Sequence, residues 1–229
     1  KWLSTMKTRI GKCVFHGLKN EDTSEASVIL ADLAGNWREY VAGSEGFLTG
    51  EHRRGLFRHS VVWGDMSHVS SYPPLLANHS NIFFRYIRWA ESARIVWAIN
   101  YAQYIDPAHA EDWSKLWTSK GLGLILKSFK VDYKFPMEWP DKVSVYHKLN
   151  IISFDSFTLD VMIISEKSQR PAARCVEDIV IYDYKAAAKV PVPEWMRAQF
   201  NKTLQLQKEA AERAHEAMED VERRVHELE

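Results

Sequence analysis

Apolar residues in the first third of the chain recur every three or four positions, which predicts helices. Residues Lys1 to Ile10 form a short basic amphipathic pattern. A second helical pattern follows Asp22 and Glu25, which have the spacing of a capping box. Its apolar positions are Ala26, Ile29, Leu30, Leu33, Trp37, Tyr40 and Val41. We therefore expect an N-terminal addition made of helices that pack on one face.

A longer apolar helix is predicted from about Asn81 to Trp97. Its apolar residues cover so much of the helix surface that we expect other elements to surround it. They are Ile82, Phe83, Tyr86, Ile87, Trp89, Ala90, Ala93, Val96 and Trp97. A strand from Val61 to Met66 precedes it, followed by an irregular segment with His68 and the turn-forming Tyr72-Pro73-Pro74.

The period of the pattern changes to two after Gly121 and Gly123, which predicts strands. The runs are Leu124 to Lys134, Lys142 to Ser153, Phe157 to Glu166 and Arg170 to Tyr184. Their short connections suit antiparallel neighbours. With the first strand they predict an α+β fold, in which a five-stranded, mostly antiparallel sheet curls round the long apolar helix and buries one face of each strand.

The chain becomes helical again from about Pro193. A heptad pattern runs through Leu204, Gln207, Ala211, Ala214, Met218, Val221, Val225 and Leu228. Alanine and glutamine at seam positions favour a helix that packs along the chain or stands alone over a coiled coil. The predicted parts are an N-terminal helical extension (1–58), a sheet-and-helix domain (59–188) and a C-terminal helical tail (189–229).

Composition limits the classes of function. With 46% hydrophobic and 12% aromatic residues, 229 residues can bury one substantial core and a smaller appendage. Thirty basic and thirty acidic residues remove the charge argument for a nucleic-acid partner. No apolar run is long enough to span a membrane. Cys13 and Cys175 lack metal-ligand spacing, and buried or free thiols are favoured over a disulfide.

The glycine spacing between Ala42 and Gly50 could suggest a phosphate-binding loop. The segment lacks the lysine and the Ser/Thr that complete such a loop. A linker or docking loop is the favoured interpretation.

Several stretches resemble the fungal thioesterase-like branch of the hot-dog superfamily, which is related to 4-hydroxybenzoyl-CoA thioesterases. They are RIGKC (9–13), AGSEGFLTG (42–50), VVWGDM (61–66), RWAESAR (88–94), KVDYKFP (130–136), VYHKL (145–149) and AARCVED (172–178). The resemblance implies a hot-dog fold, a homodimer, hydrolysis of an acyl-CoA thioester and a mitochondrial, otherwise intracellular, location. It implies no cofactor beyond the CoA of the substrate, and a place in a larger mitochondrial assembly is possible.

In such enzymes a strand end that reads Asp-x-Asp-x-x-Gly-His-Val-Asn-Asn precedes a helix with Glu-x-Ala-Arg. The resemblance maps this pattern onto four catalytic candidates, Asp65, His68, Asn81 and Glu91. A carboxylate would attack or activate water, and N–H groups at the helix start would polarise the thioester carbonyl. The chain departs from the pattern. The second aspartate is replaced by Ser67 or deleted, and the segment before His68 is about three residues short and lacks its glycine. Ser70-Ser71 replaces Asn-Asn, and an insertion spans about 72–80.

Each candidate also has a structural interpretation. Asp65 could equally cap a turn or meet Arg85 or Arg88. A surface role is favoured for His68, and an ion pair with Arg94 three residues on is favoured for Glu91. A nucleophilic Ser67–His68 pair is disfavoured, because neighbours on an extended chain point to opposite sides.

Three cations are candidates for binding the CoA phosphates, namely Lys127, Lys130 and Arg174. A solvated face of the sheet is the favoured interpretation of these cations.

Three functions remain open on the sequence. The first is an acyl-CoA thioesterase. The second is a hot-dog protein that has lost hydrolysis and serves as a binding or structural subunit of a mitochondrial assembly. The third, dehydratase chemistry on an acyl thioester, would need a histidine beside a carboxylate, for which His68 is the nearby candidate.

Overall fold

The computed structural model describes residues 1–62, 80–118 and 120–229, without the side chains of residues 20 and 80–84. The chain divides into two compact units. One unit comprises residues 48–206, and the other comprises residues 1–47 together with 207–229. No helix within the described ranges is long and apolar enough to cross a membrane.

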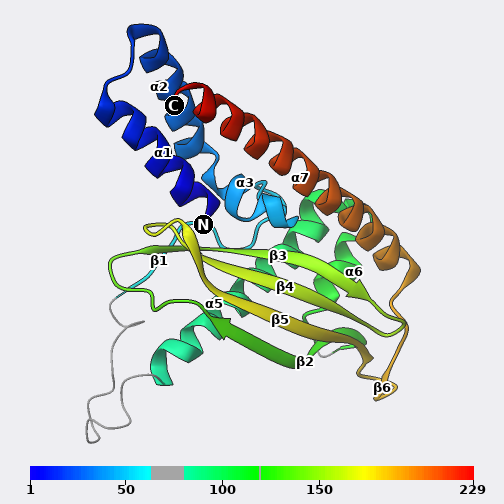
Figure 1. Ribbon diagram of the computed structural model, residues 1–229. Helices are drawn as coiled ribbons and strands as arrows, with labels where there is room; N and C mark the ends of the chain where they lie inside the picture. Colours follow the sequence, from blue (N-terminus) through cyan, green and yellow to red (C-terminus); the bar gives the residue numbers. More distant parts are fainter. Residues whose placement is uncertain (63–79, 119) are drawn as a thin grey trace, which may run out of the picture. The chain divides into compact units, whose positions relative to one another are not determined.

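The unit of residues 48–206 is built on an antiparallel sheet (Figure 1). The strands follow the order β1-β3-β4-β5-β2, and β6 pairs with the end of β5. Their bounds are β1 His59–Ser60, β2 Leu122–Tyr133, β3 Lys142–Ile152, β4 Ser156–Ser165, β5 Arg170–Asp183 and β6 Ala188–Lys189. The predicted antiparallel sheet is confirmed, and β6 was not predicted.

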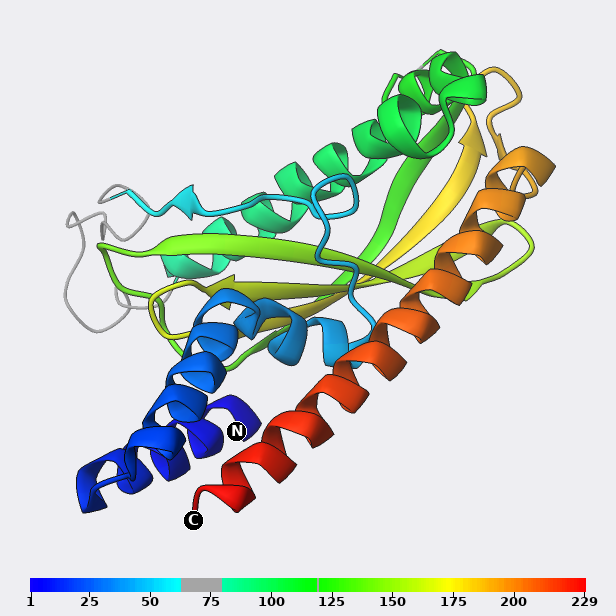
Figure 2. The same ribbon diagram turned by 90° about the horizontal axis from the view of Figure 1, so that it is seen from above.

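Helix α5 (Ser80–Asn100) lies along one face of this sheet (Figure 2). Its buried side packs on β3, β4 and β5 through residues such as Ala90, Ala93 and Trp97. The helix continues as a π-helical turn (η2, Tyr101–Ile105), followed by η3 (Pro107–His109) and α6 (Ala110–Lys115). A curled antiparallel sheet against one long helix is the hot-dog arrangement, as the sequence predicted.

The expectation that other elements surround α5 is wrong for one side of the helix. Ile95 and Ile99 are each 40% exposed, because residues four apart share one face and that face points away from the sheet. Within the described part of the chain, α5 is therefore enclosed mainly on the side that packs on the sheet.

The predicted alternation of buried and exposed residues along β3 and β4 also fails in two places. A bulge between Leu149 and Ile152 turns Ile151, predicted to face inward, to the surface. In β4 the neighbours Met162 and Ile163 are both fully buried, so both faces of that strand are covered there. The prediction of one buried face per strand therefore fails for the second half of β4.

The chain segment before α5 pairs with β3 through β1, which lies just before the predicted strand. β1 covers His59–Ser60, and beyond it the N–H of Val61 donates to the carbonyl of Asp141 at 3.0 Å. Residues 63–66 of the predicted strand lie outside the described residues. Upstream, a Cβ at Gly55 would lie 2.6 Å from the Cβ of Ala93, so only glycine lets this segment approach α5 so closely.

The other unit is a helical bundle. It contains α1 (Trp2–His16), α2 (Asn20–Gly35), α3 (Trp37–Val41), η1 (Gly43–Glu45) and the second part of α7 (Glu194–Glu227). Two ion pairs join α7 and the residues after it to the N-terminal helices: Arg9 meets Glu229 at 2.7 Å, and Arg224 meets Glu25 at 2.5 Å. The tail thus packs along its own chain, the interpretation favoured from its weak heptad seam.

The predicted capping box at Asp22 and Glu25 is wrong. Helix α2 begins at Asn20 after Lys19, which makes no side-chain capping bond. Asp22 and Glu25 therefore lie inside the helix, and Glu25 binds Arg224 instead.

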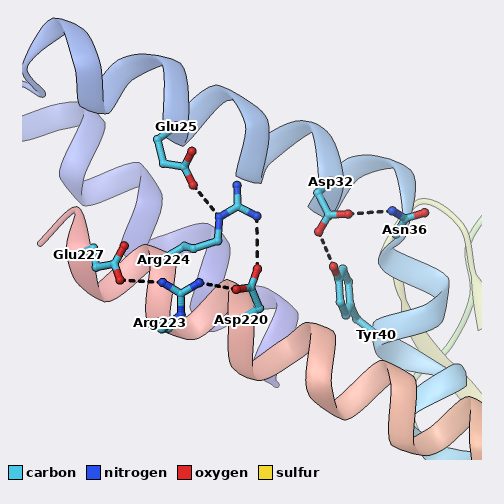
Figure 3. A network of polar contacts seen from close by, with 8 residues as sticks. All are labelled: Glu25, Asp32, Asn36, Tyr40, Asp220, Arg223, Arg224 and Glu227. Atoms are coloured by element: carbon cyan, nitrogen blue, oxygen red, sulfur yellow. Dashed lines mark hydrogen bonds and ion pairs between the residues drawn. The ribbon is translucent and has the colours of Figure 1, made fainter.

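Figure 3 shows the polar network of this bundle. Tyr40 donates to Asp32, which also accepts from the amide of Asn36 at 2.7 Å. Burial and the Asp32 carboxylate raise the pKa of Tyr40 above its usual value, so the phenol stays a donor. These bonds hold α3 against the end of α2, where the single predicted helix breaks at Asn36.

Replacing Tyr40 by phenylalanine is expected to lower the free energy of unfolding by about 1–3 kcal/mol, because Asp32 loses a charge-assisted hydrogen bond. Urea unfolding followed by circular dichroism measures the change. His16→Gln, on the exposed end of α1, is the control and should change little. Equal midpoints for Tyr40→Phe and wild type would contradict a stabilising role for this bond.

Candidate functional site

Three ionisable side chains meet in the core between α5 and the sheet. Arg94 from α5 forms an ion pair with Glu177 from β5, with 2.7 Å between Nη1 and Oε1. His147 from β3 places Nε2 3.7 Å from Oε2 of the same carboxylate. The exposed fractions are 8% for Arg94, 2% for His147 and 0% for Glu177. We call this group the polar layer.

The strand register explains why these side chains meet. His147 lies opposite Val161 of β4, and Glu177 lies opposite Leu159 of the same strand, two positions away. Residues two apart on a strand point to the same face, so both side chains face α5. The third member, Arg94, extends from the side of α5 that faces the sheet.

Burial sets the charges of the polar layer. It lowers the pKa of His147 to about 3, and the positive charge of Arg94 adds to this shift, so the imidazole is neutral at physiological pH. Burial raises the pKa of the Glu177 carboxyl, and the guanidinium of Arg94 opposes that effect. The layer therefore combines one ion pair with one neutral histidine.

The neutral His147 predicts a pH dependence of stability. Between pH 6.5 and about 3 the unfolded chain binds a proton at this residue and the folded chain does not. Stability from this group is therefore complete above pH 6.5 and falls as the pH decreases, with a slope approaching about 1.4 kcal/mol per pH unit.

Unfolding free energies measured at pH 7, 6 and 5 test this dependence. His147→Leu should flatten the slope over that range, whereas His215→Gln at an exposed position of α7 should leave it unchanged. A His147→Leu protein with the wild-type slope would show that His147 is protonated in the folded state.

The structure places two of the four catalytic candidates. Glu91 is exposed on α5, one turn before Arg94. Asn81 lies in the first turn of the same helix, and its side chain is not described. Asp65 and His68 lie outside the described residues, as do Ser67 and the insertion up to residue 79. Arg94, the predicted partner of Glu91, forms its ion pair with Glu177 instead.

The three cations predicted to bind CoA phosphates lie along β2 and β5. Lys127, at a register shift in β2, binds Asp178 at 3.0 Å. Lys130 lies opposite Val176 and Arg174 opposite Asp132, so these two cations occupy diagonal positions on the face of the sheet turned away from α5. All three therefore stay candidates for contacts with the CoA phosphates.

The functional interpretation of the sequence missed His147 and Glu177. The available signal was a charged residue at an inward position of an otherwise apolar alternation, Ala173, Cys175, Glu177 and Ile179. A buried charge is seldom placed there without a partner, so the pattern could have prompted a search for a cation on the facing helix.

Cys175 is 2% exposed, and burial raises the pKa of its thiol to about 12. Cys13 on α1 is half-buried. Because the thiolate is the reactive form, a thiol-specific reagent at pH 8 should modify Cys13 in the native protein and Cys175 only after denaturation. Rapid native modification of both thiols would contradict the packing around Cys175.

No group of three His, Cys, Asp or Glu side chains suited to a metal ion occurs in the part of the chain that the structure covers.

Residues 61–200 match the family model of the thioesterase-like superfamily. This range contains α5 and the long strands β2 to β5. The chain belongs to the thioesterase-like superfamily.

Solved structures similar to this thioesterase-like chain include three bacterial proteins. A thioesterase from Thermus thermophilus, complexed with coenzyme A and Zn, shares 21% identity over 69% of this chain and 98% of its own, with a TM-score of 0.47. A probable thioesterase from Escherichia coli shares 16% identity over 63% and 95%, with a TM-score of 0.46. A DHNA-CoA thioesterase from Staphylococcus aureus shares 17% identity over 66% and 90%, also with a TM-score of 0.46. No curated protein matched the sequence.

The polar layer lies inside the matched range, and each of its members comes from a stretch with the hot-dog resemblance. Arg94 ends RWAESAR, His147 is central in VYHKL and Glu177 is near the end of AARCVED. In this thioesterase-like protein the three stretches, far apart in sequence, meet where α5 packs on β3 and β5.

Proposed function

We propose that this chain is an acyl-CoA thioesterase in which a carboxylate, Glu91 or Asp65, attacks the thioester or activates water. The main support for this proposal is the position of Glu91, an exposed carboxylate on the central helix of a thioesterase-like fold. A carboxylate in this place can act as a base towards a bound water, and exposure keeps it accessible to substrate.

The first turn of α5 supports the second part of the mechanism. The helix starts at Ser80, and its first N–H groups have no partner within the helix. They and the helix dipole would stabilise the negative oxygen that forms when the thioester carbonyl is attacked. His68 and Asn81 remain candidates for orienting the reacting groups.

Binding of CoA and the oligomeric state complete the proposal. Lys127, Lys130 and Arg174 would contact phosphates of the substrate from the neighbouring strands β2 and β5. Among the described strands β2 has a neighbour on one side, so its other edge could pair with a second copy and form a homodimer. A mitochondrial location and membership of the fungal, 4-hydroxybenzoyl-CoA-related branch belong to this proposal as expectations from the resemblance.

The dehydratase alternative gains no support from the polar layer. His147 and Glu177 do bring a histidine beside a carboxylate, but their side chains are enclosed in the core and have no exposed surface for a substrate to reach. The scaffold alternative, a subunit without hydrolysis, is the competing function, because the sequence from Ser67 to Ser71 departs from the catalytic pattern of such enzymes.

Hydrolysis of a panel of aliphatic and aromatic acyl-CoAs tests the proposal. We expect turnover on at least one class of acyl group, and loss of turnover in either Glu91→Ala or Asp65→Ala. A folded protein without turnover on any member of the panel would favour the scaffold function.

A further inference from the structure

The polar layer divides the apolar core of the sheet unit into two clusters. On one side lie Ala90, Val145 and Cys175, and on the other lie Trp97, Leu149 and Ile179. Each strand or helix thus contributes one polar residue between apolar neighbours of both clusters. The three polar residues, one each from α5, β3 and β5, lie side by side between the two clusters.

A layer of this kind is a poor source of stability. Removing two charges from water costs several kcal/mol per ion, and well-packed apolar replacements of a buried pair are often equally stable. In addition, the two nitrogens of His147 have no hydrogen-bond partner among the residues that the structure describes. We therefore explain the polar layer by the arrangement of α5 on the sheet that it specifies, and not by a net gain in stability.

The property that a single polar layer can specify is register. Sliding α5 by one residue moves it about 1.5 Å along its axis and turns its side chains by about 100°. Such a slide would carry the guanidinium of Arg94 from Glu177 into an apolar cluster and leave both charges buried and unpaired, which costs several kcal/mol. An apolar neighbour such as Ala90 could adapt to the slide at much lower cost.

We propose that Arg94 and Glu177 are positioning residues, which fix the register of α5 and thereby hold Glu91 and the first turn of α5 in their reactive arrangement. This inference rests on the proposed thioesterase function. Glu91 lies three residues before Arg94 on the same rigid helix, so any rotation of α5 moves both residues together. A displacement of about 1 Å at reacting groups can reduce a rate by about 100-fold.

The variants that separate positioning from stability are Glu177→Leu and the double replacement Arg94→Met with Glu177→Leu. The single variant leaves a buried unpaired guanidinium and should be strongly destabilised. The double variant removes both charges and should recover most of the wild-type stability. If the pair serves positioning, the double variant nevertheless loses kcat by about 10-fold or more with little change in KM.

A spectroscopic readout makes the test independent of turnover. A nitroxide attached to Glu91→Cys in a Cys13→Ser background reports the surroundings of position 91, since Cys175 is buried. With the pair intact we expect a single spectral component. In the double variant we expect a second component or a shifted mobility, because α5 samples more than one register.

The outcomes are distinct. A double variant with wild-type kcat and an unchanged nitroxide spectrum overturns the proposal. An inactive wild-type protein contradicts the thioesterase function, while a changed spectrum in the double variant still supports register control. If the double variant does not fold, Glu177→Asp provides the test. Its side chain is one methylene shorter and keeps the negative charge. It should fold and show a several-fold lower kcat with an unchanged pH profile, and wild-type kcat there would count against positioning.

Discussion

Replacing Glu177 by leucine is expected to lower the free energy of unfolding by about 3–5 kcal/mol, a large part of the stability of a protein of this size. The cause is the guanidinium of Arg94, which would stay buried without its 2.7 Å partner. Since arginine cannot lose its proton under ordinary conditions, the charge has no route to neutralisation. Denaturant unfolding followed by tryptophan fluorescence measures the loss.

The next residue of the same strand supplies a matched control. Asp178 forms an ion pair with Lys127, whose side chain is 58% exposed. An exposed pair is worth at most about 1 kcal/mol, so Asp178→Asn should change stability little. Similar losses for Glu177→Leu and Asp178→Asn would mean that Arg94 finds water or another partner when Glu177 is removed.

The second large effect concerns activity. Glu91→Gln should reduce kcat by about 10²–10⁴-fold if this carboxylate is the general base, because the amide has nearly the same shape and cannot accept the proton. Since Glu91 is exposed, the substitution should not change the unfolding free energy. Steady-state kinetics on the best acyl-CoA of the panel measure the change.

Glu111→Gln on α6 is the control, since Glu111 is an exposed glutamate paired with Lys115 and distant in sequence from the candidate site. It should retain wild-type kcat. If Glu91→Gln also retains it and Asp65→Asn does not, the reacting carboxylate is Asp65. Retention of activity in both variants would rule out a carboxylate mechanism through these residues.

The sequence predicted the long elements well because their periodicity is strong. The apolar helix that ends near Trp97, the antiparallel strands and the C-terminal helix all occur close to their predicted positions. Local details failed where tertiary contacts decide. Asp22 does not cap α2, because the helix already begins at Asn20 and Asp22 lies inside its first turn.

The site was less predictable than the fold. Glu91 and Arg94 have ideal spacing for an intrahelical pair, and sequence spacing alone favours that pair. The competing partner, Glu177, lies on a strand far along the chain and becomes adjacent only when the sheet curls under α5. Ile151 illustrates the same limit, because a bulge between Leu149 and Ile152 reversed its predicted direction.

Release of free CoA from acyl-CoA by the purified chain tests the proposed function most directly. Thiol release monitored with a chromogenic reagent, on the Cys13→Ser protein to remove the accessible thiol, should give saturable turnover that depends on the carboxylate of Glu91 or Asp65. A folded protein that binds acyl-CoA and releases no CoA from any acyl class would contradict the thioesterase function.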